Sequence, residues 1–303
     1  METEINGIVV IDKPADITSA KVVAIVKKLL RAKKVGHTGT LDPFATGVMI
    51  CCINQATRLA RFFLSGYKTY EAVLRLGLET DTQDGTGAVT SRCETFEFSE
   101  KKIRSTLDQF IGTITQQPPV FSALKHKGVP LYKFARSGQP VRKAARRVEI
   151  ESIEIRAIEL PEVRFLVSCS AGTYIRTLCA DIGTALGCGG HLKALRRIES
   201  SGFSIHEAIS LPELEALAAS GNVRGHIMGM AAALRCMPSL VADSALIDKI
   251  RYGKPLTNLD IGAGRKDLSG DVVKVLDPEN RLLAILNFNK KDGTYKYNCV
   301  FRP

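Results

Sequence analysis

Two segments of this sequence alternate apolar and polar residues, and this alternation limits the folds that the chain can adopt. The segments are KTYEAVLRLG (68–77) and EVRFLVSCS (162–170). Successive side chains of a strand point to opposite faces, so each segment predicts a strand with one buried face. Tyr70 lies on the apolar face of the first strand. We therefore expect a sheet with one buried face that carries Tyr70 inward.

A helical pattern directly follows the second of these strands. In AGTYIRTLCADIGTALG (171–187) the apolar residues recur at helical spacing. Thr173 is the predicted N-cap and Gly187 the predicted end of the helix. Tyr174 and Arg176 then fall in its first turn. Strands and helices mixed in this way indicate an α/β (α+β) chain.

A Gly- and Pro-rich loop lies between two further elements. A β-rich run at 6–12 leads into a helical pattern with Ser19 as its predicted N-cap, and the loop GHTGTLDPFATG (36–47) comes after it. Asp42 is the one acidic residue of this loop. The loop lacks the lysine of a phosphate-binding P-loop and has no neighbouring acid for a glycosidase-like pair. Spacing alone leaves two roles open for Asp42, a turn-forming residue or a catalytic carboxylate.

Positive charge is concentrated in one stretch of the chain. There are 42 Lys plus Arg against 31 Asp plus Glu, which gives a formal net charge of +11. Residues 116–147 contain no acid and interleave Phe121, Tyr132 and Phe134 with cations. This pattern suits a phosphate backbone with unstacked bases, so we expect contact with RNA or DNA; a solvated basic face is the alternative. The cations are Lys125, Lys127, Lys133, Arg136, Arg142, Lys143, Arg146 and Arg147.

Several classes of protein are disfavoured by the sequence. The eight cysteines include no C-x-x-C pair and the five histidines no HExxH pattern, so we expect no metal centre. The N-terminus has no signal-peptide pattern, and the longest apolar runs are shorter than the ~20 residues of a membrane span. We therefore expect a reduced, cytoplasmic protein that does not associate with membranes.

The chain is long enough for one large domain and one small one. Short strand patterns separated by turn signals such as DPEN appear toward the C-terminus. We expect a larger domain at 1–238, which includes the basic insertion at 116–147, and a small β-rich module at 239–303.

Five blocks of the sequence resemble the TruB family of tRNA pseudouridine synthases, in the family's order within residues 6–205. They are NGIVVIDKPADITSAKVVAIV, VGHTGTLDPFATGVMI, YEAVLRLGLETDTQDGTG, QQPPVFSALKHKGVPLYKFARSG and CSAGTYIRTLCADIGTALGCGGHLKALRR. The tail is similar to the RNA-binding PUA module. The resemblance implies a mixed, largely antiparallel central sheet flanked by helices. It also implies a monomeric isomerase that flips uridine 55 from the T arm of tRNA and converts it to pseudouridine, with no cofactor and no protein partner.

The resemblance also assigns roles to individual residues. Asp42 matches the catalytic aspartate, Tyr70 the tyrosine that stacks on the flipped base, and Arg176 the arginine that pairs with the aspartate. Without the family, Tyr70 would be read as core. The remaining matches are His37, which fills the space left by flipped bases, Tyr174 and the apolar contact Leu195 at the substrate, and Lys13 and Gly39 as support for the loop. The basic residues expected to bind tRNA are Lys125, Arg136, Arg142, Lys143, Arg146 and Arg147.

Two other functions remain open from the sequence. One is a non-catalytic tRNA-binding or chaperone protein with the same fold, and the other is a guide-dependent synthase subunit of a larger particle. For Asp42 itself, a carboxylate can add to the base, attack the sugar carbon or remove a sugar proton.

Overall fold

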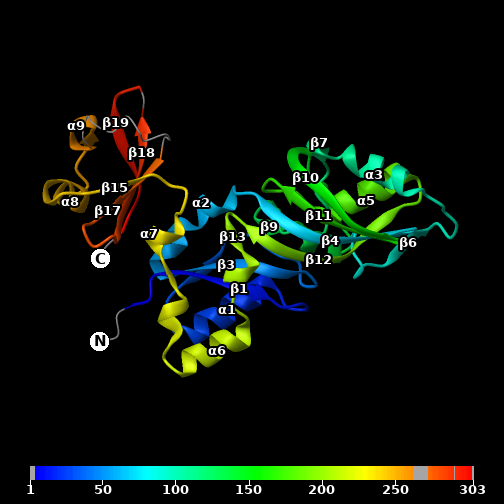
Figure 1. Ribbon diagram of the computed structural model, residues 1–303, viewed down its shortest axis with the longest axis horizontal. Helices are drawn as coiled ribbons and strands as arrows, with labels where there is room; N and C mark the ends of the chain where they lie inside the picture. Colours follow the sequence, from blue (N-terminus) through cyan, green and yellow to red (C-terminus); the bar gives the residue numbers. More distant parts are fainter. Residues whose placement is uncertain (1–3, 262–271, 290, 302–303) are drawn as a thin grey trace.

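A large mixed sheet forms the centre of this computed structural model, which describes residues 4–261, 272–289 and 291–301 (Figure 1). Within the large sheet, β3 and β12 pair in parallel and the other neighbours are antiparallel. The predicted sheet type is therefore confirmed. The strand order is β14 (Met228–Gly229), β1 (Gly7–Lys13), β3 (Thr46–Ile53), β12 (Gly190–Ser200), β4 (Lys68–Leu76), β11 (Glu162–Cys169), β10 (Arg146–Glu159) and β7 (Gly112–Gln116), with β2 (Val35–His37) on β3 and β13 (Phe203–Ser204) on β12.

Helices cover this sheet in separate groups (Figure 1). Helices α3 and α5 pack against β4, β10 and β11, whereas α1 and α6 lie beside β1 and β3. The helices are α1 (Ser19–Leu29), α2 (Ala60–Leu64), α3 (Glu100–Asp108), α4 (Leu131–Arg136), α5 (Ile175–Leu186), α6 (Leu211–Ala219), α7 (Met230–Ala233), α8 (Ser244–Arg251) and α9 (Asn258–Ile261), with 3-10 turns at Asn54–Leu59, Ile205–Glu207 and Val223–His226. None of the helices in these described ranges is long and apolar enough to cross a membrane.

The apolar pattern of each strand depends on whether one or both of its faces are buried. Strands β4 and β11 alternate buried and less buried residues, as predicted, and Tyr70 is 7% exposed. Strands β1 and β3 are instead nearly continuous apolar runs, because α1 covers one face and a second apolar cluster covers the other. Residues 38–45, which include Asp42, form the loop that connects β2 to β3.

A five-stranded sheet lies near the C-terminus. Its order is β15 (Ser239–Val241), β17 (Val272–Leu276), β18 (Leu282–Asn289), β19 (Thr294–Val300) and β16 (Leu256–Thr257). Leu282 and Phe301 share an apolar cluster with Ile8 and Phe63, so the two sheets pack through a common core. The predicted module boundary at 238/239 falls just before β15, and 262–271, 290 and 302–303 of that module lie outside the described residues.

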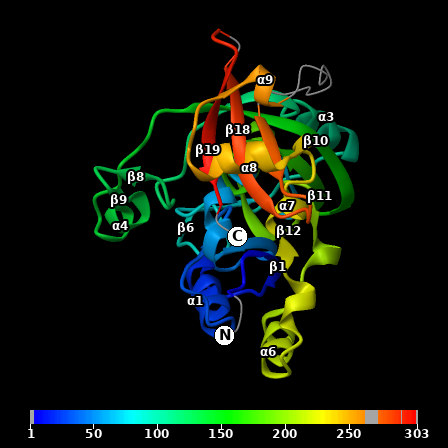
Figure 2. The same cartoon turned by 90° about the vertical axis from the view of Figure 1, so that its left-hand side faces the viewer.

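The basic insertion joins β7 to β10 and contains a small hairpin and a helix. Its elements are β8 (Lys125–His126), β9 (Val129–Pro130) and α4. In Figure 2 these elements project to one side of the large sheet. A further hairpin, β5 (Leu78–Thr80) with β6 (Val89–Arg92), follows β4.

Two predicted helix caps are wrong. The N-cap of α1 is Thr18, whose side chain accepts from Lys21 N at 3.1 Å, because Ser19 is buried and bonded elsewhere. Helix α5 begins at Ile175, because Tyr174 still has extended backbone angles and is the N-cap. The Thr173 hydroxyl donates to Ser170 O at 2.9 Å and does not cap the helix. Gly187 ends α5 as predicted, with φ 87°.

Candidate active site

The loop that carries Asp42 is fixed on both sides of this residue. Ser19 Oγ donates to Leu41 O at 3.0 Å and accepts from Leu41 N at 2.9 Å. The fully buried Lys13 donates to Pro43 O at 2.9 Å and to Ala45 O at 2.6 Å. These bonds leave little freedom to the backbone at Asp42, so its carboxylate is held in one place.

Arg176 connects Asp42 to a second carboxylate. Its Nε lies 2.9 Å from Asp42 Oδ2, and its Nη1 lies 3.3 Å from Oδ2 of Asp84. Backbone carbonyls complete its surroundings, with Nη1 donating to Thr82 O and Nη2 to Phe121 O, both at 2.8 Å. The Asp42 side chain is 35% exposed and that of Asp84 5% exposed. Asp42 is therefore the carboxylate that a bound molecule can reach, and Asp84 positions Arg176 from behind.

Asp42 experiences opposing electrostatic influences. Burial raises the pKa of its carboxyl group above the ordinary value, the positive charge of Arg176 opposes this shift, and the charge of Asp84 adds to it. A buried carboxylate keeps its charge only with such a partner. Arg176 thus favours the ionised form of Asp42.

Tyr70 lies beside another buried arginine. Arg197 is the cross-strand neighbour of Tyr70, and it donates to Val48 O at 2.7 Å and to Gly39 O at 3.1 Å. Burial raises the pKa of the Tyr70 hydroxyl, and the charge of Arg197 with its hydrogen bond to the phenol opposes that shift. A Cβ added at Gly39 would lie 3.4 Å from Arg197 Nη1, an ordinary van der Waals distance. Because a guanidinium only donates, the Tyr70 proton stays available for another acceptor.

Tyr174 precedes the first turn of α5 and is held by Gln116. Gln116 Oε1 accepts from Tyr174 N at 2.7 Å, and Gln116 Nε2 donates to Tyr174 O at 3.0 Å. The Arg146 Cζ lies 5.2 Å from the Tyr174 ring centre, a cation–π contact. Strand β7 and strand β10 thus meet the N-terminus of α5 at this point.

These groups surround one cavity of about 400 Å³. The cavity brings together residues that were predicted separately from the sequence, while His37 and Lys13 lie outside its lining. His37 Nδ1 accepts from Gly39 N at 3.2 Å, and burial lowers the pKa of its imidazole. The predicted residues on the lining are Gly39, Asp42, Tyr70, Arg146, Tyr174, Arg176 and Leu195.

Most of the predicted basic residues lie away from this cavity. Lys125 is in β8, Arg136 ends α4, and Arg147 is in β10, whereas Arg142 and Lys143 lie in the irregular segment before β10. Arg136 Cζ stacks 5.5 Å from the Tyr132 ring centre. These cations remain candidates for contact with a large polyanion outside the cavity.

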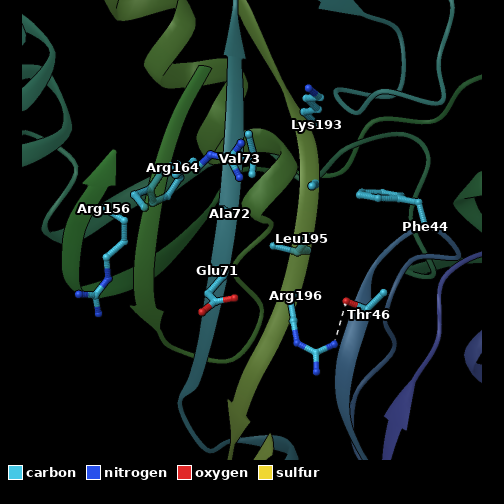
Figure 3. A pocket seen from close by; sticks show the side chains of 12 residues that line it. Phe44, Thr46, Glu71, Ala72, Val73, Arg156, Arg164, Lys193, Leu195 and Arg196 are labelled. Carbon is cyan, nitrogen blue, oxygen red and sulfur yellow. Dashed lines mark hydrogen bonds between the residues drawn. The ribbon is translucent and has the colours of Figure 1, made fainter. Parts of the chain in front are cut away.

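A second hollow of about 500 Å³ shares Leu195 with the first (Figure 3). Leu195 belongs to β12, and Phe44, two residues after Asp42, points toward this strand. Arg196 points toward Thr46, to which it donates at 3.4 Å. Asp42, Tyr70 and Arg176 do not line this hollow. The acidic, phenolic and guanidinium groups of the candidate site therefore lie in the first cavity.

Asp84, Arg197 and Gln116 were not predicted from the sequence as site residues, and Ser19 was predicted only as a helix cap. The sequence holds one signal for Asp84, a second Gly-rich acidic turn in TDTQDGTG. Arg197, Ser19 and Gln116 carry no local signal, because their partners are distant in sequence. Within the part of the chain that the structure describes, no group of three or more His, Cys, Asp or Glu could hold a metal ion.

Comparison with known proteins defines the class of this fold and site. The model of the TruB family pseudouridylate synthase N-terminal domain matches residues 27–175, and that of the tRNA pseudouridylate synthase B C-terminal domain matches residues 176–235. The tRNA pseudouridine synthase B of Geobacter sulfurreducens is 42% identical over 273 residues, 89% of this chain and 90% of the relative. That of Burkholderia mallei is 39% identical, covering 93% and 92% of the two chains. The chain belongs to the TruB family of pseudouridylate synthases.

Solved structures support the same fold. A chain from a Cbf5-Nop10-Gar1 complex matches with a TM-score of 0.75 at 29% identity, covering 98% of this chain and 85% of that one. A chain from an H/ACA RNP bound to a substrate RNA containing 2'-deoxyuridine matches with a TM-score of 0.75 at 27% identity. The predicted pseudouridine synthase fold is thus confirmed.

Proposed function

We propose that this protein converts uridine 55 in the T arm of tRNA to pseudouridine, with Asp42 as the catalytic carboxylate. The observation that carries the proposal is the Asp42–Arg176 ion pair in a TruB-family chain, facing a cavity that also contains Tyr70. In this reaction the bond from C1' of the ribose to N1 breaks and a bond from C1' to C5 forms. The C5 proton leaves, and N1 gains a proton. The composition of the nucleotide is unchanged, because the proton lost from C5 to water is balanced by the proton gained at N1.

Each residue has a role that its surroundings support. Departure of the base creates positive character on the sugar, which the ionised Asp42 can stabilise, trap, or relieve by removing a proton. Tyr70 stacks on the base and donates its free proton. Because the target is stacked in a folded loop, the base must leave the stack to enter the cavity, whose volume of about 400 Å³ lies in the range of small-molecule sites.

The rest of the chain serves tRNA recognition in this proposal. The insertion at 116–147 contacts phosphates, and the module at 239–303 is a second RNA-binding unit. We further propose a monomer that acts in the cytoplasm without protein partners. Relatives at 39–42% identity are named tRNA pseudouridine synthase B, whereas the Cbf5 structures that contain partner proteins match at 27–29%.

Purified protein assayed alone on a T-arm hairpin tests this proposal. The hairpin carries tritium at C5 of the target uridine, so isomerisation releases tritium to water. Release without additions is expected. Tight binding without release would indicate an RNA chaperone, and release only after adding further protein and RNA would indicate a subunit of a particle.

The pH dependence of the single-turnover rate should report Asp42. Because burial raises its pKa, the rate at saturating RNA should fall on acidification at a pH above the ordinary carboxyl value of about 4. Replacing Arg176 by Gln removes the positive neighbour, which favours the neutral acid and raises the pKa further. The acid limb should therefore move to higher pH by roughly one unit or more. If the acid limb stays at the same pH or moves to lower pH, Arg176 does not control the charge of Asp42.

Charge reversal in the insertion should weaken binding more than catalysis. We expect Lys125, Arg142 and Lys143 changed together to Glu to reduce hairpin affinity, and to flatten the slope of log affinity against log salt by roughly 0.7–0.9 per lost phosphate contact. The rate at saturating RNA should change little. The control reverses Lys101, Lys102 and Arg104, which are exposed on α3. Equal losses of hairpin affinity in both variants would show that the insertion acts only as a general basic surface.

A further inference from the structure

Three buried polar atoms of the described residues that line the Asp42 cavity have no hydrogen-bond partner. One is Nε of Arg176, which is in an ion pair with Asp42 at 2.9 Å. The other two are Oγ of Ser122, a residue that is 4% exposed, and Nε of Arg146, and neither of them has such a partner. Both residues line the cavity. Buried polar groups are nearly always hydrogen-bonded, so an orphan pair at one site needs an explanation.

Arg146 is fixed in position by its neighbours. Its Cζ lies over the Tyr174 ring at 5.2 Å, and its Nη2 donates to Gly172 O. A Cβ added at Gly172, whose φ is 92°, would lie 3.2 Å from Arg146 Cζ. None of the ion pairs of the described residues involves Arg146. Arg146 therefore presents an uncompensated charge and a free Nε–H group.

Ser122 is also tied down on both sides. The carbonyl of the preceding residue, Phe121, accepts a hydrogen bond from Arg176 Nη2 at 2.8 Å. The carbonyl of Ser122 accepts a hydrogen bond from Tyr132 N at 3.1 Å. The backbone of this segment is therefore held in place. Ser122 Oγ can gain a partner only from a molecule in the cavity, which is water in the free protein and a ligand in the complex.

The surroundings favour an anionic acceptor. Lys68 and Arg197 line the same cavity and donate to backbone carbonyls, at 2.7 Å from Lys68 to Gly66 O and 2.7 Å from Arg197 to Val48 O. Among the described lining residues, Asp42 is the one carboxylate, and Arg176 already pairs with it. The N-terminus of α5, which has no side-chain cap, adds its positive dipole end.

We propose that Ser122 and Arg146 form a phosphate subsite that holds one backbone phosphate next to the target uridine. The Ser122 hydroxyl and the Arg146 Nε–H group both donate to the phosphate, whose oxygens accept several bonds at once. The inference rests on the proposed function and adds to it a subsite and a residue, Ser122. The subsite fixes the strand at the cavity while the base turns.

Hairpins with a single neutral methylphosphonate test this subsite. The modification is placed in turn at each phosphate flanking the target, and affinity is measured for the parent, Ser122→Ala, Arg146→Gln and the double variant. In the parent, one position should lower affinity by at least ~10-fold, as for lost hydrogen bonds to a charged group. In the double variant the same position should cost about twofold or less, because the contact is already absent.

Matched variants separate this role from a structural one. Ser105→Ala and Arg104→Gln, both on the exposed face of α3, should leave the methylphosphonate profile unchanged. Ser122→Ala should weaken RNA binding yet leave the melting temperature of the free protein unchanged or slightly higher, because its hydroxyl has no partner there. A lower melting temperature with an unchanged profile would assign Ser122 to packing and overturn the subsite.

The affinity readout keeps this inference separate from the proposed function. Failure of the parent to convert the hairpin would overturn the proposed function and leave the binding profiles readable. If every phosphate position behaves alike in the parent and the double variant, there is no phosphate subsite. If the cost of Ser122→Ala is the same with every methylphosphonate but shrinks with 4-thiouridine at the target, the hydroxyl contacts O4 of the base instead, and the proposal is wrong.

Discussion

Replacing Asp42 by Asn should remove turnover while leaving the fold and RNA binding largely intact. Asn keeps the size of the side chain, and the loop is held by Ser19 and Lys13 rather than by the Asp42 carboxylate. The negative charge is lost, and with it the group that meets positive character on the sugar. We expect the single-turnover rate on a T-arm hairpin to fall by at least ~1,000-fold, or ~4 kcal/mol in the barrier.

The control for this variant is Asp108→Asn, an exposed carboxylate at the end of α3. It should retain the parental rate. Hairpin affinity of Asp42→Asn should stay within a few-fold of the parent. If Asp42→Asn converts the hairpin at more than a per cent of the parental rate, Asp42 is not the catalytic carboxylate.

Replacing Tyr70 by Phe should slow turnover strongly with little loss of binding. Phe keeps the aromatic face that stacks on the base and loses the proton that Tyr70 can donate. It also leaves Arg197 without one of its acceptors. We expect a fall of roughly 100-fold or more in the single-turnover rate, within the usual range for one acid–base group.

Tyr67→Phe is the matched control, because Tyr67 is 41% exposed and its hydroxyl donates to Glu149 Oε2 at 2.6 Å. This change should leave the rate unaltered. Near-normal turnover by Tyr70→Phe would assign Tyr70 to packing and stacking alone.

The sequence predicted the elements that follow from local pattern. Alternation placed β4 and β11 correctly and turned Tyr70 inward, because each strand has one face on the core. Glycine at position 187 marked the end of α5, since this residue adopts a positive φ. The cap of α1 could not be predicted from local pattern, because Thr18 and Ser19 both carry hydroxyls and only tertiary contacts decide which one caps the helix.

Most of the residues that support the site could not be predicted from the sequence. Asp84 reaches Arg176 across 92 residues, and Arg197 reaches Gly39 across 158. Such pairs depend on the strand order, in which β12 lies between β3 and β4. Family resemblance supplied Asp42, Tyr70, Arg176 and the supporting Lys13. It did not supply Asp84, Arg197 or the unpartnered hydroxyl of Ser122.

Site mapping in a full-length tRNA tests the central claim most directly. The purified protein, with no other protein, RNA or cofactor added, is incubated with a transcript that has uridine at position 55 and with a matched transcript that has cytidine there. The proposal predicts one pseudouridine per molecule at position 55 in the first transcript and none in the second. Conversion at other uridines in both transcripts, or no conversion until further components are added, would contradict it.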